Sequence, residues 1–450
     1  MNIDFIILAA GKGKRMAGHV PKVLKILGGK PMAQHVMDTT KLFKRSKALV
    51  VVGNQSKEVK NSLVLGSNGS WVKQMKQLGT GHAVKQCLSS LRKNSISVVL
   101  YGDVPLVEQK TLDKLIKSAI KDDLAILTMN IDNPKGYGRI IRDSKNKIIG
   151  IREEKDATNE EREIKEVNTG IIAIRSNLLK ELIPKIKNKN ASKEFYLTDI
   201  VEVAKKDGKS VKAINPLSQD ETLGANSVEE LHHLERIYQK KEALKLISKG
   251  VRFGDINRFD IRGTLKASPG CFVDVNCIFE GEVELARNTN IGPNCYIKNS
   301  KIGENTKILP NTVIEDSVIG KNCSLGPFLR ARGNSIIQQE VDLGNFVEIN
   351  RSKLQDGVKA KHLTYLGDAQ VGPRANIGAG TITCNYDGRK KFTTVIEEEA
   401  FIGSNSSLVA PVKIGKKAYT GAGSVITKNV PSGKLAIGRG RQKNIDKKKT

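Results

Sequence analysis

Short apolar runs alternate with amphipathic segments along the first half of the chain. The apolar runs cover residues 3–10, 48–53, 97–101, 124–129, 170–174 and 211–214 and predict strands. Between them, apolar residues at helical spacing over residues 32–43 and 112–119 predict helices. This alternation predicts a mostly parallel sheet with helices on both faces, a Rossmann-like α/β domain.

A longer helical pattern begins at Ser227. Ser227 and Glu230 have the spacing of a capping box. Apolar residues then keep near-helical spacing to Gly250, which predicts one helix of about six turns. We interpret residues 227–250 as a linker helix between a first domain over 1–226 and a second over 251–450.

Beyond residue 250 a short repeat replaces the earlier pattern. Aliphatic residues recur at intervals of six, at 302, 308 and 314, at 319 and 325, at 371 and 377, and at 402, 408 and 414. A period of six suits neither an isolated helix nor a meander, but it suits a parallel β-helix with one inward aliphatic residue per flat face. A polar, basic insertion over 386–391 interrupts the repeat, and a basic tail follows Pro431.

Composition narrows the class of protein. The chain has 450 residues, 39% of them hydrophobic and 27% charged, which is typical of a soluble protein with two or three domains. No apolar stretch is long enough to span a bilayer and no secretory leader is recognisable, so we expect a cytoplasmic protein without integral membrane association. The six scattered cysteines form no C-x-x-C pair and indicate neither a zinc site nor a redox dithiol.

The net charge of +28 raises the question of nucleic-acid binding. However, lysines are spread along the whole chain, and aromatic residues make up only 4% and do not interleave with them. We therefore favour small anionic substrates and expect no specific nucleic-acid partner.

A glycine-rich segment, L-A-A-G-K-G-K-R-M over residues 8–16, follows the first predicted strand. Its glycines let backbone N–H groups approach an anion, and Arg15 and Lys22 add positive charge, which favours a phosphate-rich ligand. Met16 replaces the third glycine of a dinucleotide fingerprint, and a P-loop's Ser or Thr is missing. A plain strand-to-helix turn with solvated lysines is the alternative.

Asp103 follows another apolar run and so is expected at the carboxyl end of a strand. A carboxylate there suits Mg²⁺ shared with substrate phosphates. The alternative is an aspartate that begins a turn before Pro105.

The pattern L-A-A-G-x-G-x-R-M followed by P-K resembles the opening of sugar-1-phosphate nucleotidyltransferases. The six-residue repeat resembles that of hexapeptide-repeat acyltransferases, which implies a left-handed β-helix and a homotrimer. Almost the whole chain resembles the bifunctional N-acetylglucosamine-1-phosphate uridyltransferase / glucosamine-1-phosphate N-acetyltransferase family. The resemblance implies acetylation of glucosamine-1-phosphate by acetyl-CoA, then UMP transfer from UTP with release of pyrophosphate. The product, UDP-N-acetylglucosamine, is a precursor of peptidoglycan and lipopolysaccharide.

The resemblance also implies site residues in the first domain. Arg15 and Lys22 are expected to act on the phosphates, and Asp103 with Asn226 to bind Mg²⁺. The expected contacts to the nucleotide sugar are Leu8, Ala9, Ala10, Gly11, Lys22, Gln74, Gly79, Thr80, Tyr101, Gly102, Asp103, Gly138, Glu153, Asn168 and Asn226.

In the second domain the resemblance centres on His362, within K-H-L-T-Y-L-G. A lone histidine is more often structural, but its flanking residues resemble the family's catalytic segment, which implies a general base. The expected contacts to glucosamine-1-phosphate are Arg332, Asn350, Tyr365, Asn376 and Lys391, and those to acetyl-CoA are Asn385, Tyr386, Ser404, Ala422 and Arg439.

One position departs from the family pattern. Where the family usually has a lysine that meets the sugar phosphate, this chain has Asn350, followed by Arg351. We expect either weaker phosphate binding or recruitment of Arg351 at a corner of the β-helix.

Two other functions remain open at this point. One is a single-activity nucleotidyltransferase with a structural β-helix, of the ADP-glucose pyrophosphorylase kind. The other is a non-catalytic assembly or nucleic-acid-binding protein that carries both folds.

Overall fold

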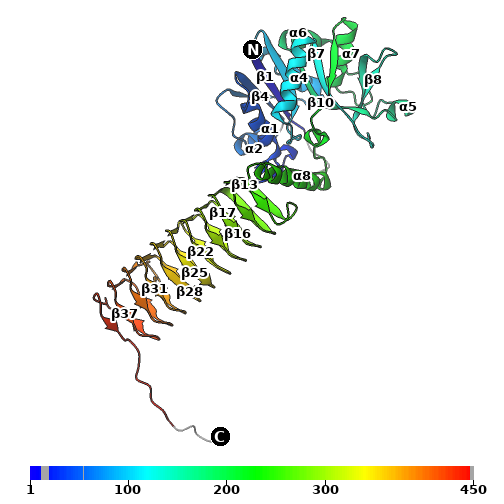
Figure 1. The fold of residues 1–450 in the computed structure, drawn as a ribbon. Coiled ribbons are helices and arrows are strands. Elements are labelled where there is room, and N and C mark those ends of the chain that lie inside the picture. Colours follow the sequence, from blue (N-terminus) through cyan, green and yellow to red (C-terminus); the bar gives the residue numbers. More distant parts are fainter. Residues whose placement is uncertain (12–19, 54, 446–450) are drawn as a thin grey trace, which may run out of the picture. The chain divides into compact units, whose positions relative to one another are not determined.

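The computed structural model describes residues 1–11, 20–53 and 55–445. The chain forms two compact units, residues 1–238 and 239–450, and the division falls inside helix α8 (Val228–Ile247) (Figure 1). The predicted linker helix is thus present, whereas the division into three parts at residues 226 and 250 stays a prediction.

A nine-stranded sheet forms the centre of the first unit, with strand order β11-β7-β10-β6-β1-β4-β5. Strand β10 runs antiparallel to both β6 and β7, and the other pairs along this order are parallel. Strands β8 and β9 form a hairpin attached to β10. The bounds are β1 Asn2–Ala9, β4 Ser46–Val52, β5 Gly69–Lys73, β6 Ser95–Tyr101, β7 Leu124–Asn130, β8 Gly138–Arg142, β9 Ile148–Arg152, β10 Glu166–Arg175 and β11 Val211–Ile214.

Helices cover both faces of this sheet, as predicted. One apolar cluster joins the sheet to α1 (Met32–Lys41), α2 (Ser56–Ser62) and α4 (Gln109–Lys121). A second joins the opposite face to α3 (Thr80–Lys85), α6 (Ser176–Leu182) and α7 (Ile200–Lys206). The six predicted strands are all present, while β5, β8 and β9 were missed because glycine and charged residues interrupt their apolar runs.

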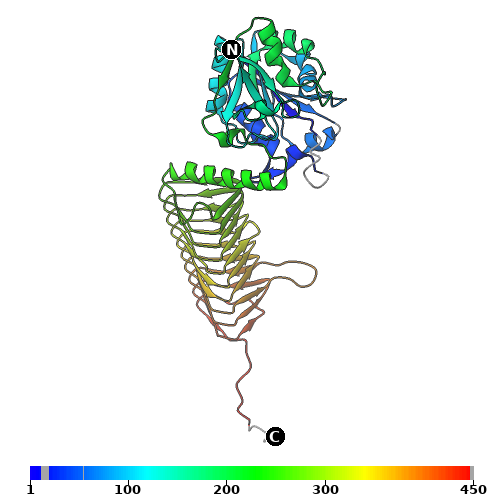
Figure 2. The same cartoon turned by 90° about the vertical axis from the view of Figure 1, so that its right-hand side faces the viewer.

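The second unit is a parallel β-helix whose coils stack regularly (Figures 1 and 2). One strand of each coil belongs to an 11-stranded sheet that runs from β12 (Arg252–Phe253) to β39 (Leu435–Ala436). The other strands belong to a 17-stranded sheet, from β13 (Phe259–Ala267) to β38 (Val425–Ile426). The aliphatic residues of the six-residue repeat are buried in one continuous core, which confirms the predicted architecture.

Asparagine recurs at the corners of successive coils, where its backbone conformation and side-chain hydrogen bonds explain why it is part of the repeat. Asn288, Asn305 and Asn322 each have φ near +57°, a conformation that asparagine adopts at low cost. Their side chains form a ladder in which each amide donates to the next, at 3.1 and 3.2 Å. The corners thereby bond successive coils to one another.

Gln239, at the start of the second unit, closes the first coil. Its side chain is buried, donates to the Ile261 carbonyl at 2.8 Å and accepts from the Ile261 N–H at 2.8 Å. These two hydrogen bonds satisfy the carbonyl and the N–H of Ile261, which have no preceding coil to pair with.

Two expectations from composition can be compared with the structure. All six cysteines are unpaired, and five of them are buried. Across the described ranges, no helix has the length and apolar character needed to cross a bilayer. The cytoplasmic location stays a prediction.

Candidate active sites

A cavity of about 800 Å³ opens at the carboxyl ends of β1, β5 and β6. Ten of the predicted nucleotide-sugar residues line this cavity: Leu8, Ala10, Gly11, Lys22, Gln74, Gly79, Thr80, Tyr101, Asp103 and Asn226. Parallel strands of an open sheet present their ligand sites at this edge. The predicted Ala9 and Gly102 lie behind this wall, where the Gly102 N–H donates to the Leu8 carbonyl at 3.0 Å. Arg15 lies outside the described residues.

Gln74 is held in one orientation at the cavity. Its amide nitrogen donates to the Gly79 carbonyl at 3.2 Å and lies 3.1 Å from Nδ1 of His82, which directs the amide oxygen away from both. Burial, with a smaller effect of Lys85, lowers the pKa of His82, so the ring is neutral and can accept this proton. Sequence reasoning missed His82 as a positioning residue.

The Gly79–Gly81 loop is clamped by the segment around Phe195. Gly79 has φ +110°, and a Cβ there would lie 2.5 Å from the Phe195 carbonyl oxygen. The Gly81 N–H donates to that same oxygen at 2.8 Å, and the Thr80 hydroxyl accepts from the Leu197 N–H at 2.9 Å. Only glycine fits at position 79 because the two backbones approach so closely.

A second cavity, of about 960 Å³, shares Tyr101, Asp103, Glu194 and Asn226 with the first. Glu153 lines it and accepts a hydrogen bond of 2.8 Å from Thr198. Burial raises the pKa of Glu153, an effect that the Thr198 hydrogen bond opposes.

The wall behind this second cavity carries the remaining predicted residues. The buried Asn168 side-chain oxygen has no hydrogen-bond partner in the described part of the chain, so its capacity to accept a hydrogen bond is unused. Gly138 packs against Ile151 and Glu153. Burial, then the charges of Glu153 and Asp103, raise the pKa of Tyr101, so its hydroxyl stays protonated.

Lys22 stands where the two cavities meet. Its ammonium forms an ion pair with Asp103 and donates to the Asn226 side-chain oxygen at 2.6 Å. The carboxylate of Glu230 in turn accepts from the Asn226 backbone N–H, and its own N–H donates to Ser227 at 3.1 Å. The predicted cap at Ser227 is therefore present, although Glu230 reaches one residue further back than a capping box requires.

The contacts that Asp103 and Asn226 make with Lys22 indicate whether these two residues suit a metal ion. The oxygens of Asp103 and Asn226 converge on one cationic group, and both belong to the ligand types that Mg²⁺ prefers. No group of three acidic, cysteine or histidine ligands occurs in the described residues. The donor set thus suits a cation that is shared with substrate phosphates.

In the β-helix, His362 lies at the corner between β28 (Lys359–His362) and β29 (Tyr365–Gly367). Its Nδ1 lies 2.9 Å from the side-chain oxygen of Asn345, one coil earlier. Because that oxygen only accepts, this contact selects the tautomer of the neutral ring that has its proton on Nδ1 and a lone pair on Nε2. The ring itself is exposed.

The strands beside this corner carry the predicted sugar residues. Arg332 pairs with Glu348 at 2.7 Å, and Asn350 lies in register with Arg332 and Gly367. The Tyr365 hydroxyl lies over Gly367, where a Cβ would be 2.3 Å away. On the other side of the corner, Asn376 lies in β31 (Asn376–Ile377) beside Lys359.

The predicted acetyl-CoA residues fall into two groups. Asn385 and Tyr386 lie at the insertion, the loop that projects from the β-helix in Figure 2, where Tyr386 forms a bridge with Lys391. Ser404 and Ala422 are exposed at corners of successive coils, and Arg439 donates to the Ala422 carbonyl at 2.5 Å. The structure brings Ser404, Ala422 and Arg439 together, while Asn385 and Tyr386 form a separate group.

Both halves of the chain match known families. The MobA-like NTP transferase domain matches residues 5–160, the GMPPB C-terminal domain matches 261–365, and the bacterial transferase hexapeptide (six repeats) matches 393–428. Among solved structures, 4-diphosphocytidyl-2C-methyl-D-erythritol synthase from Anaerococcus prevotii is 17% identical with a TM-score of 0.39, covering 53% of this chain and 96% of that chain.

Curated relatives match along the full length. Bifunctional protein GlmU of Stutzerimonas stutzeri is 45% identical over 446 residues, covering 99% of this chain and 98% of the relative. Bifunctional protein GlmU of Idiomarina loihiensis is 47% identical over 445 residues, covering 99% and 97%. Because these relatives match almost the whole of both chains, the chain belongs to the GlmU family of bifunctional proteins.

Proposed function

We propose that this protein acetylates glucosamine-1-phosphate with acetyl-CoA and then transfers UMP from UTP to the N-acetylated product, giving UDP-N-acetylglucosamine and pyrophosphate. The observation that carries the proposal is the pair of joined cavities with Lys22, Asp103 and Asn226 at their junction. A second, independent site lies around His362 in the β-helix.

In the first unit, the cavity of Gln74 takes the nucleotide and that of Glu153 takes the sugar phosphate. The Gln74 amide oxygen accepts from the N3–H of uracil, and Glu153 and Asn168 accept from hydroxyl or amide groups of the acetamido sugar. The sugar phosphate is already anionic, so no base is required, and the site acts by alignment and charge neutralisation. Asp103 and Asn226 would hold Mg²⁺, which neutralises phosphate charge, and Lys22 donates to phosphate oxygens.

In the β-helix, the neutral amine of glucosamine-1-phosphate attacks the thioester carbonyl. A C–N bond forms, Nε2 of His362 takes the proton that the amine loses, and the C–S bond breaks to release coenzyme A as a thiolate, which the imidazolium then protonates to the free thiol. Asn345 holds the ring and stabilises the protonated imidazole through Nδ1. Arg332, Asn350, Tyr365, Asn376 and Lys391 bind the sugar phosphate, and Ser404, Ala422 and Arg439 bind acetyl-CoA with Asn385 and Tyr386.

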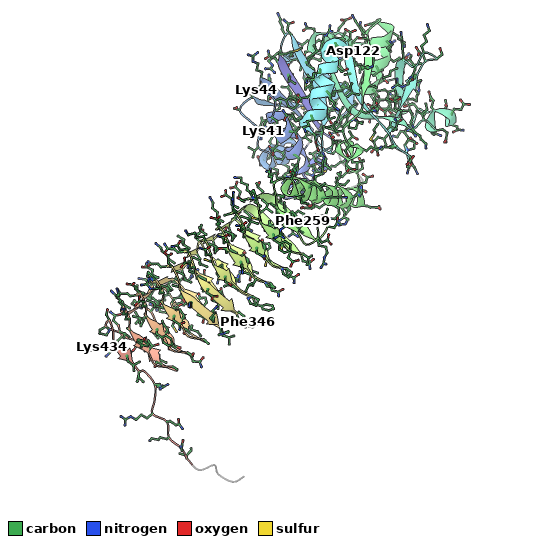
Figure 3. All side chains as sticks on the ribbon, viewed as in Figure 1. Lys41, Lys44, Asp122, Phe259, Phe346 and Lys434 are labelled. Atoms are coloured by element: carbon green, nitrogen blue, oxygen red, sulfur yellow. The ribbon has the colours of Figure 1, made fainter. Side chains whose placement is uncertain are left out.

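We also propose that the active form is a homotrimer. Phe328, Phe346 and Leu363 stand at successive corners with φ between +49° and +57°, which costs bulky residues about 1–2 kcal/mol each. All three are exposed, and the two phenylalanine rings stack with centroids 5.3 Å apart; Phe346 is labelled in Figure 3. This strained apolar ladder, next to Asn345 and His362, suits contact with a second copy of the chain.

The test uses purified protein with glucosamine-1-phosphate, acetyl-CoA, UTP and magnesium, with thiol and pyrophosphate measured separately. We expect pyrophosphate only when acetyl-CoA is present, loss of pyrophosphate release alone in Asp103→Ala, and loss of thiol release alone in His362→Ala. Pyrophosphate from supplied N-acetylglucosamine-1-phosphate without any thiol release would indicate a single-activity nucleotidyltransferase. Neither product would favour the non-catalytic function.

For the trimer, sedimentation velocity would compare the wild type with Phe346→Ser. We expect a trimeric wild type and dissociation in the variant. A monomeric wild type would overturn the assembly but not the two activities.

A further inference from the structure

An ion pair stands behind the acetyltransferase face, at the corner that follows Asn350. Arg351 and Asp368 occupy successive corners of the β-helix, with φ +49° at both. The Arg351 guanidinium donates to the two Asp368 carboxylate oxygens, from Nε at 2.8 Å and from Nη2 at 2.9 Å. This two-pronged geometry fixes both side chains more firmly than a single contact would.

The pair also holds one amide on each side. Nη1 of Arg351 donates to the Asn350 side-chain oxygen at 3.1 Å, and the Asn385 amide nitrogen donates to Asp368. With its oxygen held by Arg351, the Asn350 side chain turns its NH₂ group toward the Tyr365 hydroxyl, 3.5 Å away. Asn350 is 3% exposed, so its amide has little freedom to turn otherwise.

Charge reinforces the arrangement. Arg351 lowers the pKa of Asp368, and Asn385 and Lys391 act in the same direction against the effect of burial. The side chains of Arg351 and Asp368 are 35% and 17% exposed, so water weakens their attraction only in part.

Arg351 is not itself arranged as a phosphate ligand. All three of its side-chain nitrogens donate to Asp368 or Asn350, and its charge is balanced by the carboxylate. These contacts favour an indirect role for Arg351 over direct replacement of the missing lysine.

We propose that Arg351 and Asp368 are positioning residues for acetyl transfer: one ion pair orients Asn350 toward the phosphate of the acceptor sugar and Asn385 toward acetyl-CoA. The inference rests on the proposed acetyltransferase function. It means that two residues touching neither substrate set the affinity for both, and that the phosphate meets an oriented neutral donor at Asn350.

The test measures KM for glucosamine-1-phosphate and for acetyl-CoA separately, using the full-length protein. In Arg351→Met we expect both KM values to rise about fivefold or more, with the uridyltransferase rate unchanged, because the amides lose their holders. In Arg351→Lys an ammonium still pairs with Asp368 but lacks the fork that also reaches Asn350. We therefore expect KM to rise for the sugar phosphate and to stay near the wild-type value for acetyl-CoA.

A matched control is Arg330→Met, which breaks an ion pair with Glu315 at 3.1 Å on an earlier coil and should leave both KM values unchanged. A double-mutant cycle provides the decisive comparison. In an Asn350→Ala background, Arg351→Met should no longer raise KM for the sugar phosphate but should still raise it for acetyl-CoA.

Three outcomes would overturn the inference: unchanged KM values in Arg351→Met, equal increases for both substrates in Arg351→Lys, or an undiminished sugar-phosphate effect in the Asn350→Ala background. If the Met variant melts far below the wild type, the Lys variant decides by itself. Absence of thiol release from the wild-type protein would instead refute the proposed function.

Discussion

The ammonium of Lys22 forms an ion pair with the carboxylate of Asp103 at the junction of the two cavities in the first unit. The same ammonium also donates to the side-chain oxygen of Asn226, which lies 204 residues away in sequence. No local sequence pattern indicates this second contact. A cation thus already stands between the two oxygens that are proposed to hold Mg²⁺. Metal binding at that point requires the lysine to move.

This competition predicts that Lys22→Met strengthens metal binding while it weakens catalysis. Removing the ammonium leaves the Asp103 carboxylate without a competing cation, so Kd for Mn²⁺ should fall severalfold. Electron paramagnetic resonance of free Mn²⁺, titrated with protein in the absence of substrates, measures this directly. Lys44→Met, at an exposed position labelled in Figure 3, is the control. A higher Kd in Lys22→Met would show that the lysine supports the metal site.

Gly79→Ala should weaken UTP binding. The added Cβ would lie 2.5 Å from the Phe195 carbonyl oxygen at a φ of +110°, so the loop that carries Thr80 must shift. A strain of about 1–3 kcal/mol corresponds to a KM for UTP roughly 5–150 times higher. Steady-state kinetics with varied UTP would measure this.

The acetyltransferase rate should not change in that variant. Gly150→Ala, at a strand position where a Cβ meets nothing within 4 Å, should leave both activities intact. An unchanged KM for UTP in Gly79→Ala would mean that the loop does not contact the nucleotide.

Asn345→Ala should lower kcat for acetyl transfer by about tenfold or more, because Nδ1 of His362 loses the acceptor that orients the ring. Asn345→Asp keeps an acceptor oxygen in the same place and should retain far more activity than the alanine variant. Stopped-flow measurement of thiol release separates this effect from product release. Equal losses in the two variants would argue against the orienting hydrogen bond.

The stability of the first unit should depend on pH through the ionisation of the Asp199 carboxyl group. Burial, then the negative charges of Glu202, Glu153 and Asp156, raise the pKa of Asp199 to about 6 from its ordinary value of 3.8. Between these two values the folded protein binds more protons than the unfolded chain, so the free energy of unfolding falls as pH rises. The contribution is fully present below the unfolded-state pKa of 3.8 and is lost as pH rises through about 6.

Asp199→Asn should therefore raise the melting temperature at pH 7.5 relative to the wild type and reduce the difference between pH 5 and pH 7.5. Differential scanning calorimetry at the two pH values would test this. Asp132→Asn, at a fully exposed side chain, is the control. The same pH difference in Asp199→Asn and the wild type would contradict the prediction.

The β-helix could be predicted because its signal is local: an inward aliphatic residue recurs every six positions, and those residues are buried in the structure. Asp103 could be placed at a strand end for the same reason. The contact of Thr198 with Glu153 and that of Leu197 with Thr80 could not be predicted, because they join segments 45 and 117 residues apart in sequence. The contact of His82 with Gln74 spans only eight residues, but no residue pattern in the sequence indicates it. The pairing of Asn226 with Asp103 at a magnesium site was expected from resemblance alone, and the contact of Asn226 with Lys22 has no local sequence pattern.

The position of Arg351 shows a second limit of prediction from sequence, which concerns strand alternation. Adjacent residues of a regular strand point to opposite faces, so the alternation rule alone would separate the side chains of Arg351 and Asn350. In the structure Asn350 ends strand β26 (Glu348–Asn350), and Arg351 lies at the corner with φ +49°. The turn brings its guanidinium back to the Asn350 amide, so the alternation rule fails where the strand ends.

The carboxamide of Gln239 imitates a peptide group at the open end of the β-helix. A parallel stack otherwise exposes unpaired N–H and C=O groups at its first coil, and such an edge can recruit strands from other molecules. An excised acetyltransferase fragment that starts at residue 251 would lose this plug and would be prone to self-association, while one that starts before Gln239 would keep it. The helix between the folds is therefore also part of the folding unit that follows it.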